Sequence, residues 1–238
     1  MNSISDAFLK DLQALQNPEH AKALSRFFKT EKGGYGEGDI FWGIQVPVQR
    51  TISRKYYRQM PLSELPLLIS HPVHEVRLCT LMLMVYRYEK SKDTAEQAQL
   101  AKVYLDNLKW VNNWDLVDAS APNIIGAWFY ERDRKDLYQM ATSDHLWTQR
   151  VAMLASYYFI KRKDFGTALE IATLLLHHKH DLIHKAVGWM LREIGNRDYQ
   201  TEYNFLLMHY KTMPRTMLRY AIEKFDEEIR QGFLKGSI

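Results

Sequence analysis

The sequence predicts an all-α protein, an α-solenoid of antiparallel helix pairs (HEAT-like repeats) that is curved and has a basic concave face. The 238 residues include only 11 Gly and 7 Pro, so turns are few and long helices are favoured. Apolar residues recur at helical spacing, and no segment has the alternation of a strand. A weak internal repeat supports stacked helix pairs in a single domain over residues 1–238.

The expected helices follow one another with short connections. Ser5 or Asp6 is expected to cap the first helix, Pro18 precedes the second, and Pro47 suits a first helical turn. Asn112 or Asn113 is expected to cap the helix that carries Trp114. We expect helices over residues 3–16, 19–30, 46–59, 62–70, 73–89, 94–108, 113–119, 122–131, 145–161, 165–178, 181–195, 199–212 and 215–233.

The repeat consists of a basic residue that leads directly into an apolar helical run. Arg150, Lys185 and Arg219 follow one another at intervals of 35 and 34 residues, and Arg77 precedes Arg150 by 73, about twice as far. In a solenoid, equivalent positions form a row near helix N-termini, and such a row suits a phosphate backbone. The alternative is that each basic residue is solvated or paired locally at the start of its helix.

Composition limits the class of partner and the compartment. The 32 basic and 28 acidic residues leave a net charge of +4, which permits nucleic acid as a partner without requiring it. The single cysteine, Cys79, excludes an intramolecular disulfide framework and a cysteine zinc site, and it fits a reducing cytoplasm. The N-terminal segment is a polar amphipathic helix rather than a signal peptide, and no apolar run is long enough to span a membrane.

Two tryptophans have neighbours that suggest a site. Trp114 and Asp118 are four residues apart and share a helix face, where a carboxylate beside a large aromatic ring is either exposed or part of a site. Asp115 is expected to be a structural residue of the first helical turn. Trp189 lies one turn beyond Lys185 and is either a core residue or a neighbour of the basic row.

Three further features have a plain interpretation beside a functional one. The loop Gly33–Asp39 is a connector or faces a ligand, and Gly188 permits either a close ligand or tight helix packing. Trp147 is expected to pack in the core. The histidines at 177, 178, 180 and 184 include a helical i,i+4 pair but lack the His-Glu-x-x-His arrangement, so neither a metal nor an organic cofactor is expected. The sequence also has no serine-hydrolase elbow, P-loop or dinucleotide fingerprint.

At these residues the chain resembles the AlkD-like family of DNA alkylation repair proteins, the HEAT-like-repeat DNA glycosylases. The resemblance extends over essentially the whole chain, and the order and spacing of the matching stretches make it specific. They are residues 16–19 (QNPE), 25–29 (SRFFK), 43–47 (GIQVP), 114–118 (WDLVD), 147–150 (WTQR), 185–193 (KAVGWMLRE) and 213–224 (MPRTMLRYAIEK).

The resemblance implies hydrolysis of the N-glycosidic bond of cationic N3- and N7-alkylated purines in duplex DNA. Asp118 matches the family's catalytic carboxylate, Trp114 and Trp189 match the tryptophans that flank the deoxyribose, and Arg150 matches an arginine that contacts phosphate. Phe27 stands where members often carry a tyrosine, so it keeps an aromatic wall without the hydroxyl. The family is thought to work from the sugar side, without a pocket for a flipped base.

The site expected from the residues and the resemblance together is catalytic at Asp118, Trp114 and Trp189. The expected DNA contacts are Arg150, Phe27, Lys185, Arg192, Arg77 and Arg219. We expect a monomeric, DNA-associated cytoplasmic protein with no obligatory protein partner and no membrane contact. The alternatives are a non-catalytic solenoid that binds DNA or DNA junctions, and a protein-binding helical scaffold.

Overall fold

The computed structural model describes residues 3–238, and within them it is helical without a β-strand. One isolated bridge pairs Ile40 with Val73. The all-α helical-repeat class predicted from the sequence is confirmed. Contacts between Cα atoms divide the chain into two compact units, Met1–Ile124 and Ile125–Ile238. Each unit is described by itself below, and the single-domain organisation stays a prediction.

The first unit is built around one buried helix. Its helices are α1 (Ile4–Gln13), α2 (Pro18–Phe27), α3 (Val46–Tyr56), α4 (Leu65–Ile69), α5 (His74–Lys90), α6 (Thr94–Asp106) and α7 (Trp114–Ala121). Helix α5 packs against α3, α4, α6 and α7, and every residue from 74 to 85 is buried. The inner-helix position predicted from this apolar run is therefore confirmed.

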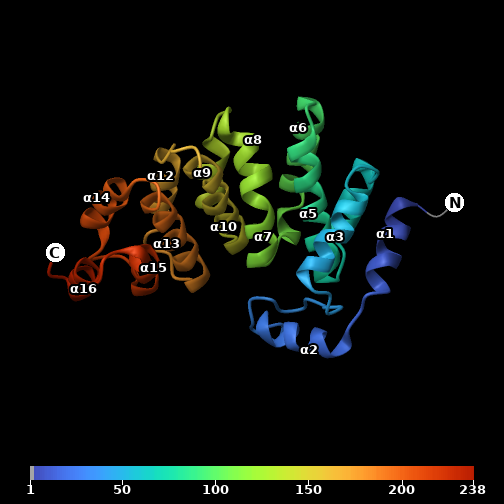
Figure 1. The fold of residues 1–238 in the computed structure, drawn as a ribbon, viewed down its shortest axis with the longest axis horizontal. Coiled ribbons are helices and arrows are strands. Elements are labelled where there is room, and N and C mark those ends of the chain that lie inside the picture. The colour runs from blue at the N-terminus through green and yellow to red at the C-terminus, as the bar shows by residue number, and fades with distance from the viewer. Residues whose placement is uncertain (1–2) are drawn as a thin grey trace. The chain divides into compact units, whose positions relative to one another are not determined.

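Helix α2 differs from its neighbours because none of its residues is fully buried. Figure 1 shows it crossing below the ends of α3 and α5. Asn17 caps it by accepting a hydrogen bond from the His20 amide, and Pro18 occupies its first turn. This exposed position leaves one side of α2 open to form the wall of a pocket.

The second unit is built around α13 (Asp181–Gly195), which packs against α10, α11, α12, α14 and α15. The other helices are α8 (Ala127–Tyr130), α9 (Lys135–Ala141), α10 (Leu146–Ala155), α11 (Tyr157–Ile160), α12 (Gly166–Leu174), α14 (Tyr199–His209), α15 (Arg215–Ala221) and α16 (Glu227–Lys235). A Cβ at Gly188 would lie 2.4 Å from the Met217 carbonyl oxygen and 2.5 Å from Cβ of Tyr220. Gly188 therefore serves tight packing of α13 on α15.

The structure corrects several expected boundaries. Ser3, rather than Ser5 or Asp6, caps α1, with Asp6 completing a capping box. The expected helix 145–161 breaks at Ser156, whose hydroxyl donates to the Met153 carbonyl, and 215–233 breaks at Phe225, whose backbone is extended. Helix α9 was not expected, because polar residues flank the few apolar side chains that it buries.

Irregular turns connect several of these elements. Single 3₁₀ turns span Leu62–Glu64, Leu108–Trp110 and Ile222–Lys224, and one π-helical turn spans Pro122–Gly126. Over residues 3–238, no helix is both long enough and apolar enough to cross a membrane.

Candidate functional site

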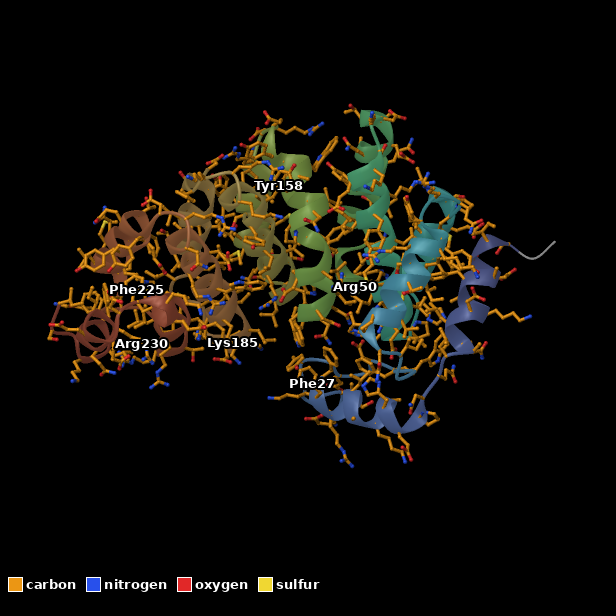
Figure 2. All side chains as sticks on the ribbon, in the orientation of Figure 1. Phe27, Arg50, Tyr158, Lys185, Phe225 and Arg230 are labelled. Atoms are coloured by element: carbon orange, nitrogen blue, oxygen red, sulfur yellow. The ribbon has the colours of Figure 1, made fainter. Side chains whose placement is uncertain are left out.

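A pocket of about 430 Å³ lies in the first unit between α2, α3, α5 and α7. Helix α2 contributes aromatic residues, α3 contributes an exposed arginine, and α7 contributes carboxylates. The polar and aromatic lining consists of Phe27, Phe28, Arg50, Trp114, Asp115 and Asp118. Figure 2 labels Phe27, at the end of α2, and Arg50, on α3. Trp114 and Asp118 therefore line one pocket, as their four-residue spacing on a helix predicts.

Helix α7 is fixed at its start by Asn113. This residue is fully buried, and its side-chain oxygen accepts a hydrogen bond of 2.8 Å from the Trp114 amide. It is one of the two expected caps. Leu116 and Val117 are buried on the inner side of the helix, which leaves Trp114 and Asp118 half-buried on the pocket side. Capping and amphipathicity together orient the candidate catalytic face.

Aromatic rings form one wall of the pocket. Phe28 is buried and stacks on Trp114 with a centroid distance of 5.3 Å and an interplanar angle of 20°. Phe27 meets Trp114 edge-on at 6.0 Å and 72°, and 63% of Phe27 is exposed. Such geometries are the favoured ones for aromatic pairs. Phe28 therefore supports the indole from behind while Phe27 projects beside it.

The loop Gly33–Asp39 packs onto this aromatic wall. The Tyr35 hydroxyl donates to the Phe27 carbonyl at 3.1 Å and accepts a hydrogen bond from the Trp114 indole nitrogen at 3.4 Å. A Cβ at Gly36 would lie 2.4 Å from the Phe28 carbonyl oxygen, so glycine permits this close approach. Of the two interpretations of this loop, the structure supports a part in building the site.

A buried charge network lies under the pocket. His74 contacts two carboxylates, with Nδ1 2.9 Å from Asp39 and Nε2 2.8 Å from Asp115. Arg77 pairs with Asp39 at 2.5 Å and donates to the backbone carbonyls of residues 71 and 72. Burial lowers the pKa of His74, but Asp115 and Asp39 outweigh it and raise that pKa to about 9. His74 is therefore an imidazolium at neutral pH that donates to both carboxylates.

This network corrects one expected DNA contact and adds residues that the sequence did not indicate. Arg77 is 2% exposed, so its expected place in a row on the surface is wrong. Its helix starts beneath the loop that carries Asp39, and the guanidinium neutralises that buried carboxylate. Asp115 begins its helix as expected, but it also lines the pocket and binds His74.

Asp118 influences a second buried group. Tyr104 is fully buried and lies 3.0 Å from the Ser120 hydroxyl. Burial raises the pKa of Tyr104, and the Asp118 carboxylate raises it further. The charge of Asp118 is therefore felt inside the unit as well as in the pocket.

Trp189, the second expected tryptophan, lies half-buried on α13 in the second unit. Its ring is 6.2 Å from that of Tyr157, and its indole nitrogen donates to Glu193 at 3.3 Å. Arg197 binds the other oxygen of Glu193 at 2.7 Å. Trp189 is thus neither fully buried nor loosely placed.

The expected basic residues of the second unit differ in exposure. Arg150 is only 5% exposed, and it donates to the Leu182 carbonyl at 2.6 Å, so it supports the start of α13 from inside. Lys185 is half-buried and pairs with Asp181 at 2.8 Å, while Arg192 pairs with Glu223. Arg219 is exposed. The four repeat-spaced basic residues therefore do not form a uniformly exposed row.

The histidines before α13 organise its N-terminus. His180 accepts a hydrogen bond from the Leu182 amide, His178 accepts one from the His180 amide, and His184 binds the His178 carbonyl. No cluster of three or more His, Cys, Asp or Glu in residues 3–238 is placed to hold a metal ion. Trp147 is 6% exposed, which agrees with its expected packing role.

The fold and this site define an all-helical repeat protein with an aromatic and acidic pocket. The chain belongs to the DNA alkylation repair enzyme family, whose model matches residues 8–225. The resemblance noted in the sequence is thereby confirmed, and a role in DNA alkylation repair follows from the family. A search of curated proteins finds no match.

Solved structures show the same fold at low sequence identity. One is a predicted DNA alkylation repair enzyme from Enterococcus faecalis, with a TM-score of 0.70, 17% identity, and coverage of 89% of this chain and 97% of that chain. Another is AlkD2 from Streptococcus mutans, with a TM-score of 0.53, 16% identity, and coverage of 88% and 98%. A third, smu.31 from Streptococcus mutans UA159, has a TM-score of 0.54, 14% identity, and coverage of 87% and 100%.

Proposed function

We propose that the protein is a monofunctional DNA glycosylase that hydrolyses the N-glycosidic bond of cationic N3- and N7-alkylated purines in duplex DNA. One observation carries the proposal: Asp118 and Trp114 line the same pocket from one face of α7. The family supports a repair substrate, and the pocket supports chemistry at a carboxylate flanked by aromatic rings.

A single carboxylate is sufficient for this reaction. An alkylated purine with a positive charge is already a good leaving group, so it needs no general acid, whereas glycoside hydrolases use a pair of carboxylates. As the bond breaks, the sugar gains oxocarbenium character, and Asp118 stabilises that charge at close range. The same carboxylate positions a water molecule for attack on C1′ and accepts its proton.

The tryptophans hold the sugar while its charge develops. Aromatic faces attract cations, and Trp114 is fixed by Phe28 and by its hydrogen bond to Tyr35. Trp189 supplies the second ring in the proposal, held through Glu193. Both rings are half-buried, so each keeps surface available for a ligand.

DNA contacts are proposed at Phe27, Lys185, Arg192 and Arg219, and at Arg150 through the part of its guanidinium that stays accessible. Arg77 is left out because it is buried in an ion pair. The proposed partner is duplex DNA with alkylated bases, bound by a monomer in the cytoplasm. Phosphate contacts of this kind weaken steeply as salt rises.

Incubation with a duplex that contains 7-methylguanine tests the activity by release of the free base. Asp118→Asn is expected to slow release by about a hundredfold or more, since it removes the charge and the base. Asp106→Asn is the matched control, because Asp106 is an exposed residue paired with Lys102. Salt-sensitive duplex binding without base release by the wild-type protein would instead support the non-catalytic DNA-binding alternative.

A further inference from the structure

We propose that the pocket between α2, α3, α5 and α7 receives the alkylated nucleobase itself, as a flat cation extruded from the duplex. The inference rests on the proposed glycosylase function and adds a base-binding subsite to it. It departs from the sugar-side mode that the family resemblance implies, in which no such pocket is used.

The size of the space fits a ligand of this kind. The pocket of about 430 Å³ adjoins a second space of about 360 Å³, and the two share wall residues on α2, α3, α5 and α7. Small-molecule sites have volumes of about 300–1,000 Å³. The shared residues are Leu24, Phe28, Val46, Leu78 and Asp115.

The walls suit a planar ring. Phe27 and Trp114 stand at 72° to each other, so a flat ligand stacked on one ring presents its edge to the other. Because 63% of Phe27 is exposed, its face is available for stacking. The apolar side chains of Leu24, Val46 and Met82 complete a dry surface for an aromatic ligand.

The charges suit a cation. Two carboxylates, Asp115 and Asp118, and one guanidinium, Arg50, line the pocket. Asp115 is held in place by its hydrogen bond with His74, which is 1% exposed. Arg50 is exposed on α3 and therefore lies at the mouth, where a backbone phosphate of an extruded nucleotide would pass. A cationic base gains from both carboxylates, and a neutral base does not.

Extrusion of a base costs stacking and pairing energy, and it is easiest for a damaged base. Binding energy in an aromatic, acidic pocket offsets that cost for cationic lesions only. The pocket thus supplies selectivity for charge in addition to the leaving-group chemistry at the sugar.

The test narrows the pocket without touching its charged or aromatic groups. Val46→Trp places a large side chain on the shared wall of the two spaces, and Val48→Trp is the control, a neighbour on α3 that lines neither space. Both valines are exposed, at 43% and 36%, so both variants are expected to fold. Phe27→Ala, at an exposed position, removes the stacking face and provides a second variant.

The probes are 7,9-dimethylguaninium, a cation at pH 6, and neutral 9-methylguanine, with binding measured by titration calorimetry. The wild-type protein and Val48→Trp are expected to bind the cation at least tenfold more tightly than the neutral base. Val46→Trp and Phe27→Ala are expected to lose at least tenfold in affinity for the cation. Equal binding of the two probes by the wild type, or wild-type binding by Val46→Trp, overturns the pocket assignment.

Base release from duplex DNA separates this inference from the proposed function. If Val46→Trp releases 7-methylguanine as fast as the wild type while Asp118→Asn does not, the base pocket is wrong and the glycosylase function stands. If the wild type binds the cationic probe but releases no base from DNA, the function is wrong and the pocket remains a site for a flat cation.

Discussion

The imidazole Nε2 of His74 lies 2.8 Å from a carboxylate oxygen of Asp115, and this contact joins the buried core of the first unit to the wall of the candidate site. On its other side the ring contacts Asp39, which is held in turn by Arg77. Two buried cations and two carboxylates thus balance one another beneath the pocket. The geometry of the site depends on this balance, because an unpaired charge at the same depth would be costly.

The raised pKa of His74 predicts how stability changes with pH. Its pKa is raised from 6.5 to about 9 on folding, so the stabilisation is complete below about pH 6.5 and is lost as pH rises through about 9. The contribution at low pH is on the order of 3 kcal/mol. Urea unfolding of the wild type and of His74→Gln from pH 5 to 10 measures it. A gap between the two that stays constant from pH 6 to 9 would contradict the imidazolium assignment.

Glu202 predicts a different pH window in the second unit. The residue is 1% exposed, one of its oxygens has no hydrogen-bond partner, and burial raises its pKa to about 9. The unfolded chain loses this proton near pH 4.5 and the folded one near pH 9, so the free energy of unfolding falls between these values.

Glu202→Gln is expected to remove that slope, including the part below pH 6.5 where His74 contributes none. The measurement is the urea unfolding midpoint from pH 4.5 to 6.5. A slope in this window that survives the substitution would show that Glu202 is ionised in the folded protein.

Gly188 predicts an effect of packing on the helix that carries Trp189. Gly188→Ala forces a methyl group against the backbone of α15, at 2.4 Å from the Met217 carbonyl oxygen, and should destabilise the protein by about 1–3 kcal/mol. Gly166→Ala is the control, because a Cβ there meets no atom within 4 Å. Thermal melting compares the two. Equal melting temperatures for both variants would mean that α13 and α15 are not held this closely.

Tyr35 predicts a link between the glycine-rich loop and Trp114. Tyr35→Phe removes the hydroxyl that accepts from the indole, which should cost about 0.5–1.5 kcal/mol of stability and change the emission of Trp114. Release of 7-methylguanine should slow several-fold. Tyr57→Phe is the control, since its hydroxyl binds the exposed Arg58. Base release by Tyr35→Phe at the wild-type rate would show that the loop does not position the site.

Helical periodicity and capping predicted much of the fold and one part of the site. The apolar run of α5, the cap at Asn113, and the shared face of Trp114 and Asp118 are all local features that a helix period reveals. Helix α9 was missed because its apolar face is short. The break at Ser156 depends on a single side-chain hydrogen bond, which has no periodic signal.

The charge network could not be predicted in the same way. Asp39 and Asp115 approach His74 from segments 35 and 41 residues away, and only the folded arrangement of α5, α7 and the loop brings them together. The same folding covers Arg77, which a repeat spacing placed on the surface. The aromatic support of Trp114 by Phe28 and Tyr35 depends on equally distant contacts.

The central claim is that Asp118 catalyses release of an alkylated base and leaves the sugar–phosphate chain intact. Incubation of a 7-methylguanine duplex with the protein, analysed with and without alkali, tests it most directly. The account predicts free base and an abasic site that breaks only after alkali, with both products lost in Asp118→Asn and kept in Asp106→Asn. No free base from the wild type, or equal release by Asp118→Asn, would contradict it.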